Sequence, residues 1–164
     1  MRRPGSAAAR SGASPGTGAT RPALVLTVPS ETSFLGLVRE VTRKMAETAG
    51  FDLGTADQLA LAVDEAATNV IEHAYRGAAD REVEIRLEDR GPEFKVEVVD
   101  SGDTVDPRAV PDVDLRRYVS ERRTGGLGMH LMEKIMDSVT FRRSAGRNVC
   151  RLVKRKAAAA RRRS

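Results

Sequence analysis

Residues 64–75 read DEAATNVIEHAY and combine charged, amide and apolar side chains at helical spacing. Glu65 and Asn69 are four residues apart, so on an α-helix they lie on one face, and His73 continues the same line. The apolar residues of this helix face the opposite way. A carboxylate beside an amide oxygen suits a Mg²⁺ ion that keeps waters and shares phosphate oxygens, and the carboxylate could instead orient or deprotonate a nucleophile. Taken alone, the stretch is also consistent with a solvated polar face, and His73 with a structural residue at a helix end.

The residues around this stretch predict one strand and two helices. Residues 23–28 are apolar and end at a proline, which is typical of a short strand. Apolar residues at 3.6-residue spacing predict a helix over about 30–50 that Gly50 ends. Thr55 is a good N-cap residue for the next helix, which we expect over about 56–75 and which carries the quoted stretch.

The second half of the chain predicts two hairpins separated by a long loop. Apolar and charged residues alternate over 82–88, and a turn leads to a second strand over 94–100. Residues 101–124 show little periodicity, a helix begins at Gly128, and a hairpin follows over 139–153. The order β-α-α-β-β-loop-α-β-β predicts an α+β two-layer sandwich, in which a mostly antiparallel, mixed sheet carries its helices on one face.

A carboxylate and a glycine close the second of these strands. Asp100 ends an apolar run, and Gly102 follows two residues later. Such a pair is often only a turn. At the mouth of a nucleotide cleft, a buried carboxylate in this place could accept a hydrogen bond from an exocyclic amine, and the glycine would let the backbone approach the base closely. On these residues alone both interpretations stay open.

A glycine-rich turn leads into the last predicted helix. Residues 122–129 read RRTGGLGM, and glycines directly before an apolar helix can form a backbone-amide anion site at its N-terminus. The turn is not a Walker loop, because no Gly-Lys-Ser/Thr occurs in the chain, and a hinge is the alternative interpretation. The residues of this candidate anion site are Arg122, Arg123, Thr124, Gly125, Gly126, Leu127 and Gly128.

The order and spacing of the three motifs resemble the GHKL ATPase superfamily, whose nucleotide-binding domain has the Bergerat fold. Its N box corresponds here to residues 65–69, its first glycine box to 100–102 and its second to 126–128, with the ATP lid between the glycine boxes. Within the superfamily, the sequence motifs at residues 69–75 and 125–137 are similar to those of the bacterial anti-sigma factor serine/threonine kinases. The resemblance extends over almost the whole chain outside its two ends.

The resemblance implies a role for each motif. It implies that ATP and Mg²⁺ are the cofactors, with Glu65 as general base and Asn69 on the metal. It places Asp100 on the adenine amine, and either Arg122 or Arg123 on the γ-phosphate. The remaining residues that we assign to the ATP site, most of them shaping the pocket, are His73, Gly102, Thr124, Gly125, Gly126, Leu127 and Gly128.

The function implied by the resemblance is transfer of the ATP γ-phosphate to a serine or threonine of a small partner. In the resembled family this partner is an anti-anti-sigma (STAS-type) protein, the alternative partner is a sigma factor, and homodimers are usual. A second class stays open, a catalytically silent ATP-binding module that sequesters a sigma factor or another regulator. Glu65 argues against that class, because a pure binder needs no base there.

Two other ATP-dependent classes fit less well. A sensor histidine kinase core would need a phosphoacceptor histidine upstream, whereas the chain has only His73 and His130, both inside the predicted domain. A gyrase-like or MutL-like machine would need a transducer domain of roughly a hundred residues or more, for which the chain has no room by the usual size of a domain.

Charge distribution argues against a nucleic-acid partner. The 164 residues fit one domain, expected over 23–155 between a disordered basic tail at 1–22 and a second basic tail at 156–164. The formal charge is +5, but residues 1–22 carry four positive charges and residues 154–164 carry six, without any acid, which leaves −5 on the body between them. A nucleic-acid-binding domain would concentrate positive charge on its body instead.

Cysteine content and hydropathy indicate the compartment. The single cysteine, Cys150, excludes an intramolecular disulfide and is expected to be a small buried apolar residue. No apolar run approaches the ~20 residues that a membrane-spanning helix needs. The basic N-terminus is not followed by the apolar core of a signal peptide. We therefore expect a cytoplasmic protein without a membrane partner.

Overall fold

The computed structural model describes residues 24–103 and 127–157. The predicted N-terminal tail and nearly all of the predicted lid at 101–124 lie outside these residues, as does the end of the C-terminal tail. Five strands form one sheet in the order β1-β2-β3-β5-β4, and every pairing is antiparallel in the described part of the chain. The strands are β1 (Leu24–Pro29), β2 (Glu82–Asp89), β3 (Glu93–Asp100), β4 (Ser138–Ser144) and β5 (Arg147–Arg155).

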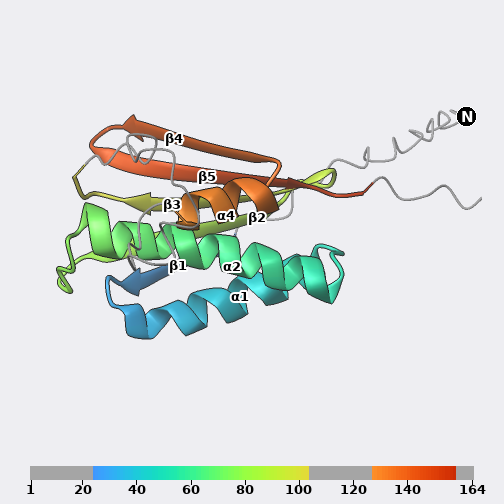
Figure 1. Ribbon diagram of the computed structural model, residues 1–164, viewed down its shortest axis with the longest axis horizontal. Coiled ribbons are helices and arrows are strands. Elements are labelled where there is room, and N and C mark those ends of the chain that lie inside the picture. The colour runs from blue at the N-terminus through green and yellow to red at the C-terminus, as the bar shows by residue number, and fades with distance from the viewer. Residues whose placement is uncertain (1–23, 104–126, 158–164) are drawn as a thin grey trace, which may run out of the picture.

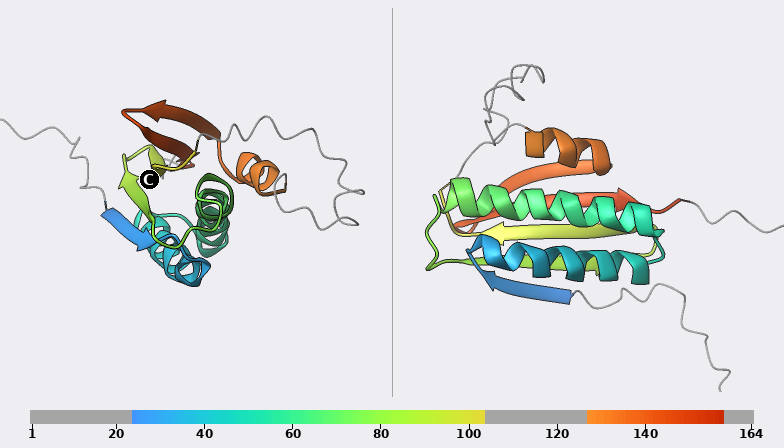
Figure 2. Two further views of the ribbon diagram at one scale, coloured as in Figure 1. Left: turned by 90° about the vertical axis from the view of Figure 1, so that its left-hand side faces the viewer. Right: turned by 60° about the horizontal axis from the view of Figure 1, so that its bottom comes forward.

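The helices all cover one face of this sheet, as the end-on view of Figure 2 shows. The long antiparallel pair α1 and α2 lies beside the shorter α4 (Figure 1). The predicted α+β two-layer sandwich is therefore confirmed, with a sheet that is antiparallel throughout its described strands rather than mixed. The helices are η1 (Thr32–Phe34), α1 (Leu35–Thr48), α2 (Leu53–Asn69), the π-helical η2 (Val70–Ala74) and α4 (Leu127–Ile135).

Period-two alternation in the strands decides which face the helices cover. Along β2, Val83, Ile85 and Leu87 are fully buried, and they belong to the same core cluster as the alternate residues of β3. The helices complete this core mainly with alanine, valine and leucine, because aromatic residues make up only 4% of the chain. The hydrophobic residues thus form one continuous layer between sheet and helices.

The start of α2 differs from the sequence prediction. The helix begins at Leu53 rather than near residue 56, and its N-cap is Asp52 rather than Thr55. The Asp52 carboxylate accepts hydrogen bonds from the Thr55 backbone N–H (3.0 Å) and hydroxyl (2.7 Å), which lower the pKa of Asp52. Both residue types are good caps, and Asp52 takes the position because its carboxylate can accept both donors of Thr55 at once.

The end of this helix also differs from the prediction of a regular helix to residue 75. The α-helix is regular to Asn69, and η2 continues it as one π-helical turn in which the Tyr75 N–H donates to the Val70 carbonyl (2.9 Å). Arg76 and Gly77 then both take positive φ angles, 52° and 77°, which reverse the chain toward β2. Single π-turns of this kind are frequent at functional sites.

The hairpin β4–β5 is longer than the predicted strand segments. Its two-residue turn consists of Ala145 and Gly146, both with positive φ (49° and 76°), the geometry of a type I′ turn. The turn fixes the register so that Phe141 pairs with Cys150 and Arg143 with Asn148. On its other edge β5 pairs with β3, and this places Asn148 opposite Asp100.

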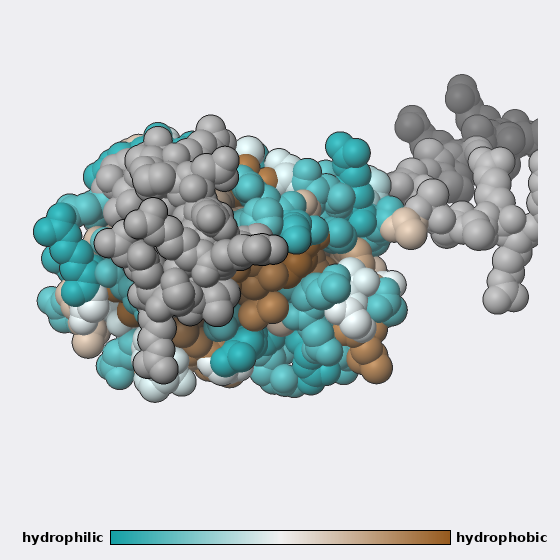
Figure 3. All heavy atoms as spheres, viewed as in Figure 1, coloured by the Kyte–Doolittle hydropathy of each residue, from teal (hydrophilic) through white to brown (hydrophobic). Residues whose placement is uncertain are grey.

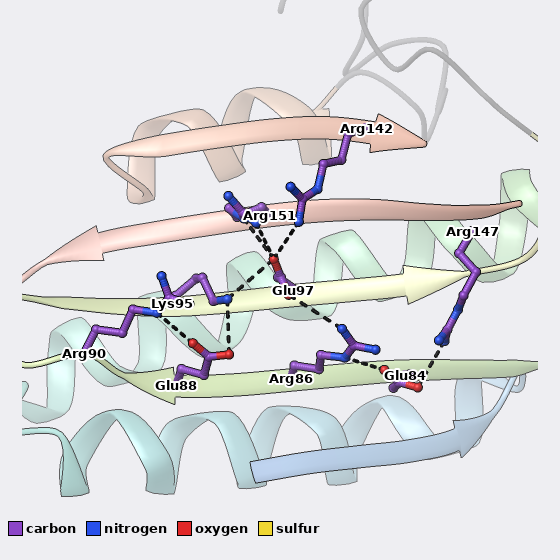
Figure 4. A network of polar contacts seen from close by, with 9 residues as sticks. All are labelled: Glu84, Arg86, Glu88, Arg90, Lys95, Glu97, Arg142, Arg147 and Arg151. Atoms are coloured by element: carbon purple, nitrogen blue, oxygen red, sulfur yellow. Dashed lines mark hydrogen bonds and ion pairs between the residues drawn. The ribbon is translucent and has the colours of Figure 1, made fainter. Parts of the chain in front are cut away.

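The face of the sheet away from the helices is charged. Figure 4 shows nine charged side chains in one network, with Glu97 near its middle; eight come from β2, β3, β4 and β5, and Arg90 comes from the turn between β2 and β3. The Glu97 carboxylate lies 2.8 Å from Arg151, 3.3 Å from Arg142 and 3.5 Å from Lys95. On the face that Figure 3 shows, hydrophilic residues make up most of the coloured surface around a hydrophobic patch. No helix among the described residues is long and apolar enough to cross a membrane.

Candidate functional site

The first and third sequence motifs meet where α2 packs beside α4. Glu65 and Asn69 lie on α2, both partly buried, and neither side chain has a hydrogen-bond partner among residues 24–103 and 127–157. Gly128 is buried in the first turn of α4, and a Cβ atom added there would collide with Oε2 of Glu65. The Glu65 carboxylate therefore lies directly against the N-terminal turn of α4, where only glycine leaves room for it.

The first and second motifs meet at the π-helical turn. The Asp103 N–H donates to the Ala74 carbonyl (3.1 Å), so the chain after β3 runs back to the end of η2. A Cβ atom added to Gly102 would lie 2.5 Å from that carbonyl oxygen and 2.7 Å from its carbon. A side chain at position 102 would thus displace backbone, which explains the glycine that follows Asp100 by two residues.

Asp100 is buried at the end of β3, with 5% of its surface exposed. Its Oδ1 atom accepts hydrogen bonds from the Gly102 N–H and from Nδ2 of Asn148, both at 2.8 Å. Asp100 and Gly102 thus form a turn, which was one of the two interpretations of the sequence. The Asp100 carboxylate is also a buried acceptor, which the other interpretation, a nucleotide site, requires. Asn148 was missed by the sequence analysis, because no motif marks it and its contact with Asp100 spans 48 residues.

Tyr75 connects these motifs and was given no role of its own in the sequence analysis. Its hydroxyl donates to the Glu82 carbonyl (2.7 Å) and accepts from the Ser101 N–H (3.0 Å), while its ring is buried in the core. The last residue of the quoted stretch therefore fixes the backbone on both sides of the candidate site. In the sequence, the only indication of this role was the position of Tyr75 at the end of residues 64–75.

The surroundings of Glu65 on α2 raise its pKa above that of an ordinary, solvated glutamate. Burial is the main cause that raises the pKa of Glu65, and the negative charges of Asp64 and Glu72 raise it further. Burial also raises the pKa of Asp64, against the opposing charge of Arg39. Nε of Arg39 forms an ion pair with Oδ1 of Asp64 at 3.5 Å, but this carboxylate oxygen is buried without a hydrogen bond among the described residues.

Two further residues lie close to the site. His73 is half-buried in η2, and its Nε2 atom is buried without a hydrogen-bond partner in the described part of the chain. Its assignment to the ATP site stays a prediction. Cys150 is buried in β5, as expected, and desolvation together with the charge of Asp100 raises the pKa of its thiol to about 12.

The remaining predicted site residues divide between described and undescribed parts. Leu127 begins α4 and is 47% exposed, next to the buried Gly128. Among residues 24–103 and 127–157 no group of three or more His, Cys, Asp or Glu side chains could hold a metal ion. The predicted Mg²⁺ ligand is therefore the single amide of Asn69. The predicted site residues outside the described part are Arg122, Arg123, Thr124, Gly125 and Gly126.

Comparison with known proteins gives consistent matches. Residues 28–154 match the model of the histidine kinase-like ATPase domain family. The serine-protein kinases RsbW of Bacillus velezensis and Bacillus subtilis are each 35% identical over 127 residues, which covers 73% of this chain and 77% of theirs. The crystal structure of the RsbU and RsbW domains of a Mycobacterium tuberculosis protein matches with a TM-score of 0.58 and 17% identity. That match covers 82% of this chain and 32% of the other, and shows likeness of fold.

Proposed function

Because the chain belongs to the histidine kinase-like ATPase domain family, we propose that it is an ATP-dependent serine/threonine protein kinase of the anti-sigma factor type. The observation that carries this proposal is the position of Glu65. Its carboxylate has a raised pKa and lies against Gly128, at the end of α4 where a phosphate would bind. A site that only bound a nucleotide would need no proton acceptor at this position.

Asp100 and Gly102 suit the adenine end of ATP. Asp100 is buried, and its Oδ2 atom accepts no hydrogen bond from the described residues, so it can accept one from the exocyclic amine of the base. Gly102 lets the chain that follows Asp100 pass directly against the Ala74 backbone, where a Cβ atom would collide. The buried acceptor at the end of β3, followed by this close backbone contact, is what supports an adenine site here.

Asn69 suits the phosphate end. It lies one helical turn after Glu65 and has no partner among the described residues, so its amide oxygen is available to a Mg²⁺ ion that keeps several waters. Bound Mg²⁺ would neutralise charge on the phosphates. Arg122 or Arg123, which lie outside the described residues, remain the proposed contacts of the γ-phosphate.

Glu65 is proposed to take the hydroxyl proton of the substrate serine or threonine as that oxygen attacks the γ-phosphate. Burial and the neighbouring carboxylates raise the pKa of Glu65, which makes its ionised form a stronger base than a solvated glutamate. Most of the rate in phosphoryl transfer comes from positioning and charge stabilisation, and the packing of Glu65 against Gly128 fixes its position.

The proposed substrate is a small anti-anti-sigma (STAS-type) protein, and a sigma factor is the proposed alternative partner. The relatives named serine-protein kinase RsbW support phosphorylation of a protein serine. A homodimer and a cytoplasmic location are further parts of the proposal. They come from the family resemblance, and the acidic body makes nucleic acid a poor partner.

A transfer assay tests the proposal. The full chain is incubated with γ-labelled ATP, Mg²⁺ and a candidate STAS-type protein, and labelled phosphoprotein is measured for wild type and Glu65→Gln. We expect label on the partner with wild type and a loss of about a hundredfold with Glu65→Gln, whose amide cannot accept the proton. Nucleotide affinity should remain, because the substitution keeps the shape of the side chain. Bound ATP without any transfer by wild type would favour the catalytically silent module instead.

A further inference from the structure

Asp100 presents two unlike oxygen atoms. Oδ1 is occupied by two donors at 2.8 Å, the Gly102 N–H and Nδ2 of Asn148, whereas Oδ2 accepts no hydrogen bond from the described residues. Two donors on one oxygen fix the rotation of the carboxylate. With Oδ1 occupied in this way, Oδ2 is the side-chain oxygen of Asp100 that no described residue occupies and that can accept a hydrogen bond from a ligand.

Asn148 holds this arrangement in one orientation. Its Nδ2 also donates to the Gly102 carbonyl (3.1 Å), while its Oδ1 accepts from Nη1 of Arg143 (3.1 Å). The same Arg143 atom also donates to the Gly102 carbonyl at 3.3 Å. A flipped amide would bring its oxygen against a carboxylate and a carbonyl, and its NH₂ group against a guanidinium. Arg143 therefore orients the Asn148 amide so that its Nδ2 atom donates to Asp100.

A carboxylate acceptor held in one orientation distinguishes the two common purines. Adenine carries an exocyclic amine, a donor, where guanine carries a carbonyl, an acceptor. A buried site built to accept a hydrogen bond discriminates strongly against a ligand that cannot donate one, because the ligand leaves both groups unpaired. Any change that frees Oδ1 weakens this discrimination, because the carboxylate can then rotate.

We propose that Asn148, oriented by Arg143, makes the site selective for adenine over guanine nucleotides by holding the Asp100 carboxylate in one orientation, with Oδ2 as the acceptor for the base. Asn148 is a positioning residue that acts through Asp100. The inference rests on the ATP site proposed above and adds the residue pair that sets its base specificity.

The test is a titration of the full chain with Mg²⁺ and each of three nucleotides: ATP, GTP and purine riboside triphosphate, which lacks the amine. Wild type should prefer ATP to both others. Asn148→Leu removes the donor to Asp100, and we expect the ATP/GTP affinity ratio to fall at least about tenfold. Asn148→Asp keeps the size of the side chain but replaces the amide donor with an acceptor, so the ATP/GTP affinity ratio should fall with this variant as well.

The neighbours Arg143 and Arg142 provide a matched pair of variants. Both are exposed residues of β4, but Arg143 contacts Asn148 whereas Arg142 contacts Glu97 on the opposite face of the sheet. Arg143→Leu should lower the ATP/GTP ratio severalfold, and Arg142→Leu should leave it unchanged. Because Arg143 is exposed, this comparison decides the question even where Asn148→Leu fails to fold.

The outcomes separate the inference from its premise. Wild type that binds no nucleotide would overturn the proposed function and this inference with it. Wild type that binds ATP and purine riboside triphosphate equally would overturn the inference alone, since the amine would then not be recognised. An ATP/GTP ratio that stays at the wild-type value in the Asn148 and Arg143 variants would likewise overturn it, while ATP binding stands.

Discussion

At the scale of single residues, two glycines that look alike in sequence have different neighbours. A Cβ atom at Gly128 would meet the end of the flexible Glu65 side chain, whereas one at Gly102 would meet the backbone of Ala74. Gly128→Ala should therefore displace the carboxylate with little cost to the fold, and lower phosphotransfer about a hundredfold. Gly102→Ala should instead cost about 1–3 kcal/mol of stability.

Thermal unfolding and transfer rates measured on both variants check this prediction. Gly36→Ala is the control, because a Cβ atom there meets nothing within 4 Å and should leave the rate unchanged. Equal loss of stability in Gly102→Ala and Gly128→Ala would contradict the assignment. The sequence could predict that both glycines matter, but not which of them faces a side chain, because that depends on how α2, α4 and the end of β3 pack.

Glu65 also gives a prediction on stability. Its folded pKa is raised above the unfolded value of 4.5, so the folded state binds more protons and loses stability as the pH rises through that interval. Glu65→Gln should therefore raise the melting temperature at pH 7 and leave it unchanged near pH 4, while transfer is lost. Calorimetry at both pH values measures this, with Glu133→Gln on the exposed face of α4 as control. A variant that is less stable at pH 7 would show that Glu65 holds the fold together instead.

At the scale of elements, the turn that follows α2 joins the motifs through Tyr75. Tyr75→Phe keeps the buried ring but leaves the Glu82 carbonyl and the Ser101 N–H without their partner. We expect a loss of about 1–3 kcal/mol in the free energy of unfolding and a weaker affinity for ATP, since Ser101 precedes Gly102. Denaturant unfolding and nucleotide titration test both effects. An unchanged affinity would mean that the backbone at Ser101 is positioned without this hydroxyl.

The same element shows what the sequence could and could not predict. Apolar spacing predicted α2 and placed Glu65 and Asn69 on one face, because that pattern repeats over several turns. It could not predict the switch to a π-helix at Val70, since five residues are too few to distinguish the two periods. Nor could it choose between Asp52 and Thr55 as cap, because both are favourable cap residues and lie three positions apart.

At the scale of the whole molecule, the sheet order brings distant residues together. Local patterns predicted the hairpins β2–β3 and β4–β5, since each forms from neighbouring segments. The pairing of β3 with β5, which brings Asn148 to Asp100, joins residues 48 positions apart and leaves no local pattern. The same pairing, together with that of β4 with β5, gathers Arg142, Lys95 and Arg151 around Glu97 on the outer face.

The network around Glu97 should contribute to the stability of the fold in a way that depends on pH. Although burial opposes its ionisation, the hydrogen bond from Arg151 and the charges of Lys95, Arg151 and Arg142 lower the pKa of Glu97 below its usual 4.5. Its contribution to stability is therefore present above pH 4.5 and lost as the pH falls through the folded pKa. The carboxylate is only 6% exposed and Lys95 equally so. Glu97→Gln should thus cost about 2 kcal/mol at pH 7.

Chemical unfolding as a function of pH measures this cost, and the difference between wild type and Glu97→Gln should shrink below pH 4. The control is Glu40→Gln, whose carboxylate pairs with Arg43 but is 64% exposed, so its removal should change stability little. Equal effects of the two substitutions would show that the outer-face network is held no more tightly than an ordinary surface ion pair. A larger effect of Glu97→Gln would show that the charged face stabilises the β3–β5 pairing, and with it the contact between Asn148 and Asp100.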